Sequence, residues 1–160
     1  MTELESKDLE FMDAAIEEAR AAAAEGEVPV GAVAVLGGEI IARARNAKEK
    51  LRDPTAHAEM SLLRKTAEKL GAWRLTGVTV YVTLEPCPMC AGAMVLARID
   101  RLVFGTHDPK MGAVRTFYSI ADDPRLNHVM EITSGVRENE CAQILSDFFR
   151  ELRIKPKTVS

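Results

Sequence analysis

The sequence predicts an α/β fold, a three-layer α/β/α domain with a mixed sheet at its centre. Segments with apolar residues at helical spacing alternate with short runs rich in β-branched residues. One strand–helix–strand run implies a parallel crossover, whereas a Gly-Gly pair joins two other strands as an antiparallel hairpin. The chain has 160 residues, 47% of them hydrophobic, which is enough for one core. We therefore expect residues 1–160 to form a single domain.

The first elements are a helix and a hairpin. Residues 7–25 are rich in Ala and Glu, carry apolar side chains at helical spacing, and are followed by Gly26, where a helix would end. Residues 30–35 and 39–45 are short, apolar and β-branched. The Gly37-Gly38 pair between them tolerates the positive φ angles of a tight turn, which predicts antiparallel pairing.

The middle of the chain predicts a second helix and the parallel crossover. An apolar stripe over residues 56–70 indicates a helix, with Thr55 as its expected N-cap. Residues 78–83 alternate and are β-branched, Pro88 suits the first turn of a helix that runs to about residue 98, and residues 101–104 resemble a buried strand.

The C-terminal part predicts one more helix, over residues 138–153. Leu145, Phe148, Phe149 and Leu152 fall on one face of this helix. A loose tail is expected beyond Pro156.

Composition and charge exclude several classes of protein. The longest apolar stretches, such as residues 28–36, are far shorter than the ~20 residues that span a bilayer, and the polar N-terminus lacks a signal-peptide core. We expect a cytoplasmic protein without membrane contact. Three cysteines, two of them at Cys-x-x-Cys spacing, argue for metal or redox use over a disulfide framework. The net charge of −3 gives no general attraction to nucleic acid.

Two short segments carry the candidate chemistry, and each opens an expected helix. Two cysteines three residues apart in a first turn, Cys87 and Cys90, can face one point, and a tetrahedral zinc ion accepts two thiolates plus the imidazole of His57. One position remains for water. Side chains lean toward a helix N-terminus, so Glu59 can reach the same point and act as a proton carrier that is not a ligand. The spacing predicts an end-on site between two helix N-termini.

A Cys-x-x-Cys pair by itself is more typical of a structural zinc half-site or a redox pair. A structural site needs a fourth protein ligand, and Cys141 could supply it. However, Cys141 lies beside apolar residues of the last expected helix, where a small apolar Cys is the better interpretation. His107 and His128 lack ligand spacing.

His-x-Glu followed by Pro-Cys-x-x-Cys is the signature of zinc-dependent nucleobase deaminases. The rest of the chain narrows the resemblance, because segments over nearly its whole length closely resemble the bacterial tRNA-specific adenosine deaminases. These segments are residues 28–32, 53–59, 83–93, 104–105, 108–113, 127–128 and 140–149.

The resemblance implies a cytidine deaminase-like fold with a central mixed five-stranded sheet, one Zn²⁺ per subunit and a homodimer. It implies hydrolytic deamination of adenosine to inosine at the wobble position of a tRNA anticodon, chiefly that of an arginine tRNA. Zinc-activated water would attack the base, Glu59 would carry protons, and the zinc and the amide of Ala58 would stabilise developing charge.

By the same resemblance, Asn46 would bind the nucleoside, although an ordinary turn asparagine is an equal alternative. The loop with Asp108 and Lys110 and the C-terminal helix would hold splayed bases of the anticodon stem-loop. In that helix the expected contacts are Phe149, Arg150 and Arg153. Residues 150–157 hold four basic residues, Lys157 among them, and one acidic residue, a local charge of +3. Basic residues also suit a helix C-terminus, and Phe149 could instead belong to the core.

Two rival functions stay open. One is deamination of a free nucleobase or nucleoside such as guanine or cytosine, by enzymes whose metal motifs look alike. The other is a zinc-stabilised RNA-binding subunit without catalysis. The basic C-terminal segment and residues 108–113 favour a polymer substrate over the first, and the presence of Glu59 argues against the second.

Overall fold

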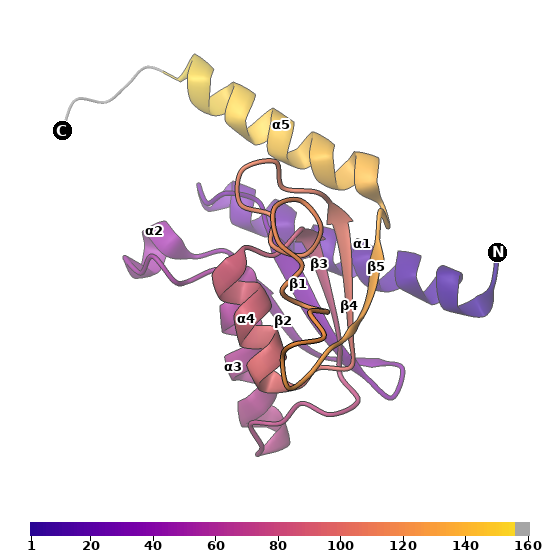
Figure 1. Cartoon of the computed structure of the whole chain (residues 1–160). Helices are drawn as coiled ribbons and strands as arrows, with labels where there is room; N and C mark the ends of the chain where they lie inside the picture. Colours follow the sequence, from indigo (N-terminus) through magenta and orange to yellow (C-terminus); the bar gives the residue numbers. More distant parts are fainter. Residues whose placement is uncertain (156–160) are drawn as a thin grey trace.

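The computed structural model describes residues 1–155 (Figure 1). The expected tail beyond Pro156, with Lys157, lies outside the described residues. The elements along the chain are α1 (Glu3–Ala24), β1 (Gly31–Leu36), β2 (Glu39–Arg45), α2 (Lys48–Leu51), α3 (Ala58–Leu70), β3 (Thr79–Leu84), α4 (Pro88–Ala97), β4 (Arg101–Thr106), β5 (Glu131–Ser134) and α5 (Glu138–Ile154).

The strands form one five-stranded mixed sheet in the order β2-β1-β3-β4-β5. β1 pairs antiparallel with β2 and β3, whereas β3, β4 and β5 are parallel. The hairpin turn has positive φ at Gly37 and Gly38, and the crossover between β3 and β4 runs through α4. The expected hairpin, crossover and mixed sheet are confirmed.

Helices cover both faces of the sheet, which confirms the three-layer architecture. α3 and α4 lie side by side on one face, and α1 and α5 cover the other (Figure 1). Leu62 of α3 and Met94 of α4 pack with Val80 and Leu102 in one core cluster. The second cluster, between the sheet and α1 and α5, includes Met12. Within residues 1–155, no helix has the length and apolarity needed to cross a membrane.

Three local features differ from the expectation. The N-cap of α3 is His57, not Thr55, because the amide and hydroxyl of Thr55 both donate to Asp53 Oδ1 and keep the chain in a turn. The short α2 lies within a connection whose polar sequence does not predict a helix. β5 lies at the sheet edge, is four residues long and has no fully buried residue. An edge strand of this kind does not need an apolar pattern, and its sequence therefore does not predict it.

The fold brings together the starts of α3 and α4. Both helices lie on the same face of the sheet and contact each other. α4 begins directly after β3, through Glu85-Pro86-Cys87. The end of β3 therefore fixes one side of the site described next.

Candidate metal centre and pocket

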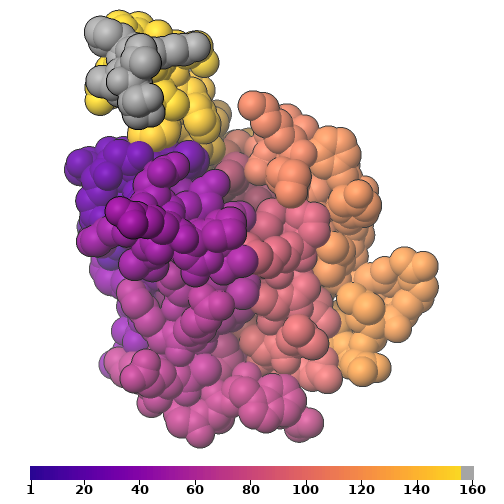
Figure 2. Space-filling model, turned by 90° about the vertical axis from the view of Figure 1, so that its left-hand side faces the viewer, coloured from indigo at the N-terminus to yellow at the C-terminus, as the bar shows by residue number. Residues whose placement is uncertain are grey.

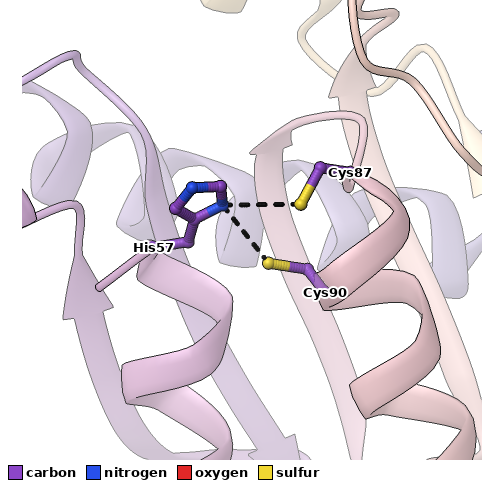
Figure 3. A group of neighbouring side chains, drawn as sticks. All are labelled: His57, Cys87 and Cys90. Carbon is purple, nitrogen blue, oxygen red and sulfur yellow. Dashed lines mark hydrogen bonds between the residues drawn. The ribbon is translucent and has the colours of Figure 1, made fainter. Parts of the chain in front are cut away.

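Three ligand-type side chains converge where α3 and α4 begin. His57 is the N-cap of α3, Cys87 is the N-cap of α4, and Cys90 lies in the first turn of α4. Neither N-cap side chain bonds its own helix; the imidazole and both thiols point toward one another (Figure 3). The Nδ1 atom of His57 lies 3.5 Å from each sulfur. The three residues thus form an end-on cluster at two helix N-termini.

The geometry of the cluster suits a zinc ion. Tetrahedral coordination with a Zn–S distance of about 2.3 Å and a Zn–N distance of about 2.05 Å puts a nitrogen and a sulfur ligand about 3.6 Å apart. The two N···S separations agree, and all three ligand atoms lie within 4.8 Å of one another. Two thiolates and one imidazole are also a donor set that zinc prefers. Three protein ligands leave one tetrahedral position open, as in catalytic zinc sites.

The alternative of a structural zinc site with four protein ligands finds no support among residues 1–155. The group that could hold a metal contains His57, Cys87 and Cys90 and no fourth side chain. Cys141 is buried on the opposite face of the sheet, in the cluster with Val103, as expected for a small apolar residue. His107 and His128 also lie outside the group.

The two thiols differ in acidity because they are hydrogen-bonded to each other. The bond with Cys90 lowers the pKa of Cys87 to about 4; burial acts in the opposite direction, and His57 adds to the lowering. The same bond, together with burial, raises the pKa of Cys90. The hydrogen bond with Cys87 raises the pKa of His57. A dication held by the cluster would favour the thiolate form of both cysteines.

Glu59 is a buried carboxyl next to the cluster without being part of it. It lies in the first turn of α3, and its exposed fraction is 4%. Burial raises the pKa of Glu59 to about 7, although its own backbone amide and the charge of His57 act to lower it. The metal-holding group does not include Glu59. The structure therefore has a carboxyl group beside three ligands, in a separate position.

A cavity of about 320 Å³ opens beside the cluster and Glu59. Figure 2 shows the face on which its two contributing segments meet, residues 28–59 (purple to magenta) and 84–111 (pink to salmon), below the end of α5 (yellow). Its volume is at the lower end of the range for small-molecule sites, about 300–1,000 Å³. Six of the residues singled out in the sequence line it: Asn46, His57, Ala58, Glu59, Cys87 and Asp108.

Asn46 offers this cavity an unused acceptor. Its exposed fraction is 4%, and its Nδ2 donates to the carbonyl of Val28 at 3.2 Å. The Oδ1 atom is buried without a hydrogen-bond partner in the described part of the chain. Because an unpaired buried acceptor is unfavourable, an N–H or O–H group of a bound molecule would stabilise this position.

The loop after β4 forms another wall of the cavity. Asp108 Oδ1 accepts hydrogen bonds from the amides of Lys110, at 2.9 Å, and Met111, at 3.2 Å. Glu85 accepts several more from the same loop. Burial acts to raise the pKa of Glu85, but hydrogen bonds from Thr116 and from loop amides lower it to about 2. Two carboxylates therefore hold the shape of this loop.

The other expected RNA contacts do not line the cavity. Lys110 is exposed on the loop beside it, and Phe149, Arg150 and Arg153 are exposed on α5. Arg150 pairs with Asp147, one turn earlier. The end of α5 projects on the side of the molecule where α2 lies (Figures 1 and 2). These residues form an outer surface.

The other six lining residues were not among the candidate site residues of the sequence: Val28, Val30, Lys48, Leu84, Glu85 and Met111. Glu85 had a usable signal, since an acid between a buried strand and Pro86 must find hydrogen-bond donors. Lys48 and Met111 lie on connections whose sequences carry no comparable signal.

Known deaminases are similar to this chain over most of its length. The MafB19-like deaminase family model matches residues 6–153. A tRNA-specific adenosine deaminase of Bacillus subtilis (strain 168) is 53% identical over 152 residues, which cover 95% of this chain and 94% of that protein. A solved structure from studies of A-to-I editing by tRNA:A34 deaminases at the wobble position has a TM-score of 0.82 and 48% identity. It covers 85% of this chain and 99% of that one.

Structures of other deaminases share the architecture at much lower identity. A structure of guanine deaminase from Nitrosomonas europaea has a TM-score of 0.72 with 22% identity, covering 86% of this chain and 82% of that one. A likeness at this level shows the fold alone.

Proposed function

This chain belongs to the MafB19-like deaminase family and, within it, to the tRNA-specific adenosine deaminases; from this membership we propose that it converts adenosine to inosine at the wobble position of a tRNA anticodon. The observation that carries the proposal is the convergence of His57, Cys87 and Cys90 beside Glu59 at one cavity. The reaction consumes one water, whose oxygen adds to carbon 6 of adenine, and releases ammonia.

We infer that His57 Nδ1 and the sulfurs of Cys87 and Cys90 hold one Zn²⁺ per chain. The 3.5 Å separations and the donor set support zinc. When bound, zinc supplies activation of a water molecule as a nucleophile near neutral pH. The protein contributes a fixed set of ligands, because all three stand at the starts of packed helices.

Glu59 is the proton carrier in this proposal. Its carboxylate takes one proton from the attacking water and delivers it to the ring nitrogen of adenine. It then takes the second proton from the hydroxyl now on carbon 6 and delivers it to the departing amine, which leaves as ammonia. Its burial and its place on the cavity wall support the role. Its position outside the metal-ligand group also supports it, because a carboxylate bound to the metal could not transfer protons freely. The amide of Ala58, the first residue of α3, is at the positive end of the helix and is suited to stabilise developing negative charge.

Contacts to the nucleoside and to the flanking RNA come from two zones. Asn46 would accept a hydrogen bond from the nucleoside through its unpaired Oδ1. Asp108 and Lys110 on the loop, and Phe149, Arg150 and Arg153 on α5, would hold the neighbouring anticodon bases after the target base leaves its stack. An arginine tRNA is the expected main substrate, by resemblance to the family.

We also infer that the protein acts as a homodimer. Leu96 is 72% exposed on α4, and a side chain added at Gly92, one turn earlier, would meet no atom within 4 Å. This outer face of α4 therefore has room for a partner, whereas Ala91 is buried against the sheet. Sedimentation of the purified protein at twice the monomer mass is the expected result.

The test of the function is an assay on a short RNA. Purified zinc-loaded protein is incubated with an arginine anticodon stem-loop, and nucleosides are identified after digestion. Inosine should replace the wobble adenosine, whereas the same hairpin with guanosine at that position should stay unchanged. Deamination of free guanine or cytidine without activity on the hairpin would contradict the proposal.

A further inference from the structure

Glu85 is enclosed by hydrogen-bond donors from the loop that follows β4. Its Oε2 accepts the amides of Val114, at 3.1 Å, Arg115, at 2.8 Å, and Thr116, at 2.9 Å. Its Oε1 accepts the amide of Asp108, at 3.1 Å, and the hydroxyl of Thr116, at 2.5 Å. With an exposed fraction of 1%, the carboxylate is the centre around which this loop folds.

The loop also fits closely around this carboxylate. A Cβ atom at Gly112 would lie 2.5 Å from the carboxyl carbon of Glu85, so residue 112 must lack a side chain. The next amide, of Ala113, donates to the carbonyl of Pro86 at 2.9 Å. Side-chain and backbone bonds together therefore tie the loop to the turn between β3 and α4.

This connection joins two walls of the cavity. Glu85 is two residues before Cys87, and the loop supplies Asp108 and Met111 to the lining. Both carboxylate oxygens already accept hydrogen bonds from the loop, so Glu85 would affect a bound molecule indirectly, through the position of the loop. Displacing the loop would move the cavity wall relative to the metal ligands.

We propose that Glu85 is a positioning residue that sets the loop of residues 108–116 against the metal-ligand turn and so shapes the wall that meets the RNA beside the target nucleoside. The inference rests on the proposed function. It differs from a purely structural role because it assigns Glu85 an effect on substrate binding by a folded, metal-loaded protein.

The test is Glu85→Gln. The amide keeps the shape of the side chain but places a donor group among N–H donors, so the loop should move. With the stem-loop as substrate, KM should rise about 10-fold or more, because the wall that positions the RNA is displaced, while zinc content stays at that of the unchanged protein. Hydrogen exchange should become faster at the amides of residues 114–116 but not in α4.

The matched control is Asp8→Asn. Asp8 is also a buried hydrogen-bonded carboxylate, 4% exposed, but it lies against the other face of the sheet. This variant should lose stability and keep the KM of the unchanged protein, measured below its unfolding temperature.

An unchanged KM for folded Glu85→Gln, or loss of zinc from it, would overturn the inference. If Glu85→Gln does not fold, Thr116→Val removes the hydroxyl bond alone and should raise KM in the same direction by a smaller factor; an unchanged KM there is equally contradictory. Failure of the proposed function is distinguishable, because then the unchanged protein would not convert the hairpin.

Discussion

At the scale of single residues, the site uses helix N-caps for a purpose other than capping. An N-cap side chain normally accepts a hydrogen bond from the first turn, which stabilises the helix by about 1 kcal/mol. His57 and Cys87 do not make this bond and point to the metal cluster instead. The first-turn amides of both helices therefore keep a partial positive charge near the cavity, which favours thiolates and an anionic reaction state.

The role of Glu59 gives a prediction for one side chain. Glu59→Ala should keep its zinc, because Glu59 is not in the group of side chains that could hold a metal, and should lose at least about 100-fold in turnover because the proposed proton carrier is gone. Metal analysis and the hairpin assay measure the two effects. Glu68→Ala, on the exposed side of the same helix, is the control that should leave both unchanged. Zinc loss from Glu59→Ala would instead make Glu59 a ligand.

Residues of the site differ in how far the sequence predicts them. His57, Glu59, Cys87 and Cys90 fall in two short segments with fixed spacing, so the cluster can be predicted before any fold is known. Glu85 could not be assigned in this way, because its hydrogen-bond partners lie 23 to 31 residues further along the chain. The unpaired Oδ1 of Asn46 likewise depends on packing that a local pattern does not contain.

At the scale of elements, the extent of helix α5 could be predicted from the sequence, but which of its side chains are buried could not. Its length follows from its apolar spacing, but Cys141 is its one buried residue. A side chain at Gly105 of β4 would lie 2.4 Å from the sulfur of Cys141, so this glycine permits the close contact. Leu152 is 56% exposed, so the helix is fixed near its start and presents its end to solvent. By contrast, β5 lacks buried residues, and nothing in its sequence distinguishes it from a loop.

The exposed end of α5 gives a prediction about salt. If it binds RNA phosphates, Arg153→Gln should weaken hairpin binding and reduce the slope of log Kd against log salt by about 0.7. Arg150→Gln should have a smaller effect because Arg150 already pairs with Asp147. Binding titrations at several salt concentrations measure both slopes. Equal, unchanged slopes would leave this end of α5 without a role in RNA binding.

At the scale of the whole molecule, a network of buried polar side chains lies on the opposite face of the sheet from the metal cluster. This network holds α1 against the sheet. Asp8 of α1 accepts two hydrogen bonds from Arg101, at 2.8 and 2.7 Å, and one from Tyr81, at 2.6 Å. Burial acts to raise the pKa of Asp8, but these hydrogen bonds outweigh it and lower the pKa. Burial and Asp8 together raise the pKa of Tyr81. The network fixes α1 to β3 and β4.

This network predicts the dependence of stability on pH. Because the pKa of Asp8 is lower in the folded protein than in the unfolded chain, its contribution is present at neutral pH and is lost as the pH falls below about 4. Asp8→Asn should reduce the free energy of unfolding by about 3 kcal/mol at pH 7, and by less at pH 3. Urea unfolding at both pH values measures the difference. Asp13→Asn, which removes an exposed pair with Arg137, should cost under about 1 kcal/mol.

The metal cluster also has a mechanical consequence. His57 and Cys87 are 30 residues apart, so an ion held between them closes a loop that contains α3 and β3. Such an ion acts as a reversible cross-link, and the free energy of binding it becomes free energy of folding. Removing it with a chelator should lower the unfolding temperature, and restoring zinc should reverse the change. The zinc ion that activates water would then also hold the starts of two helices together, so the zinc-loaded enzyme would be the form that best resists unfolding.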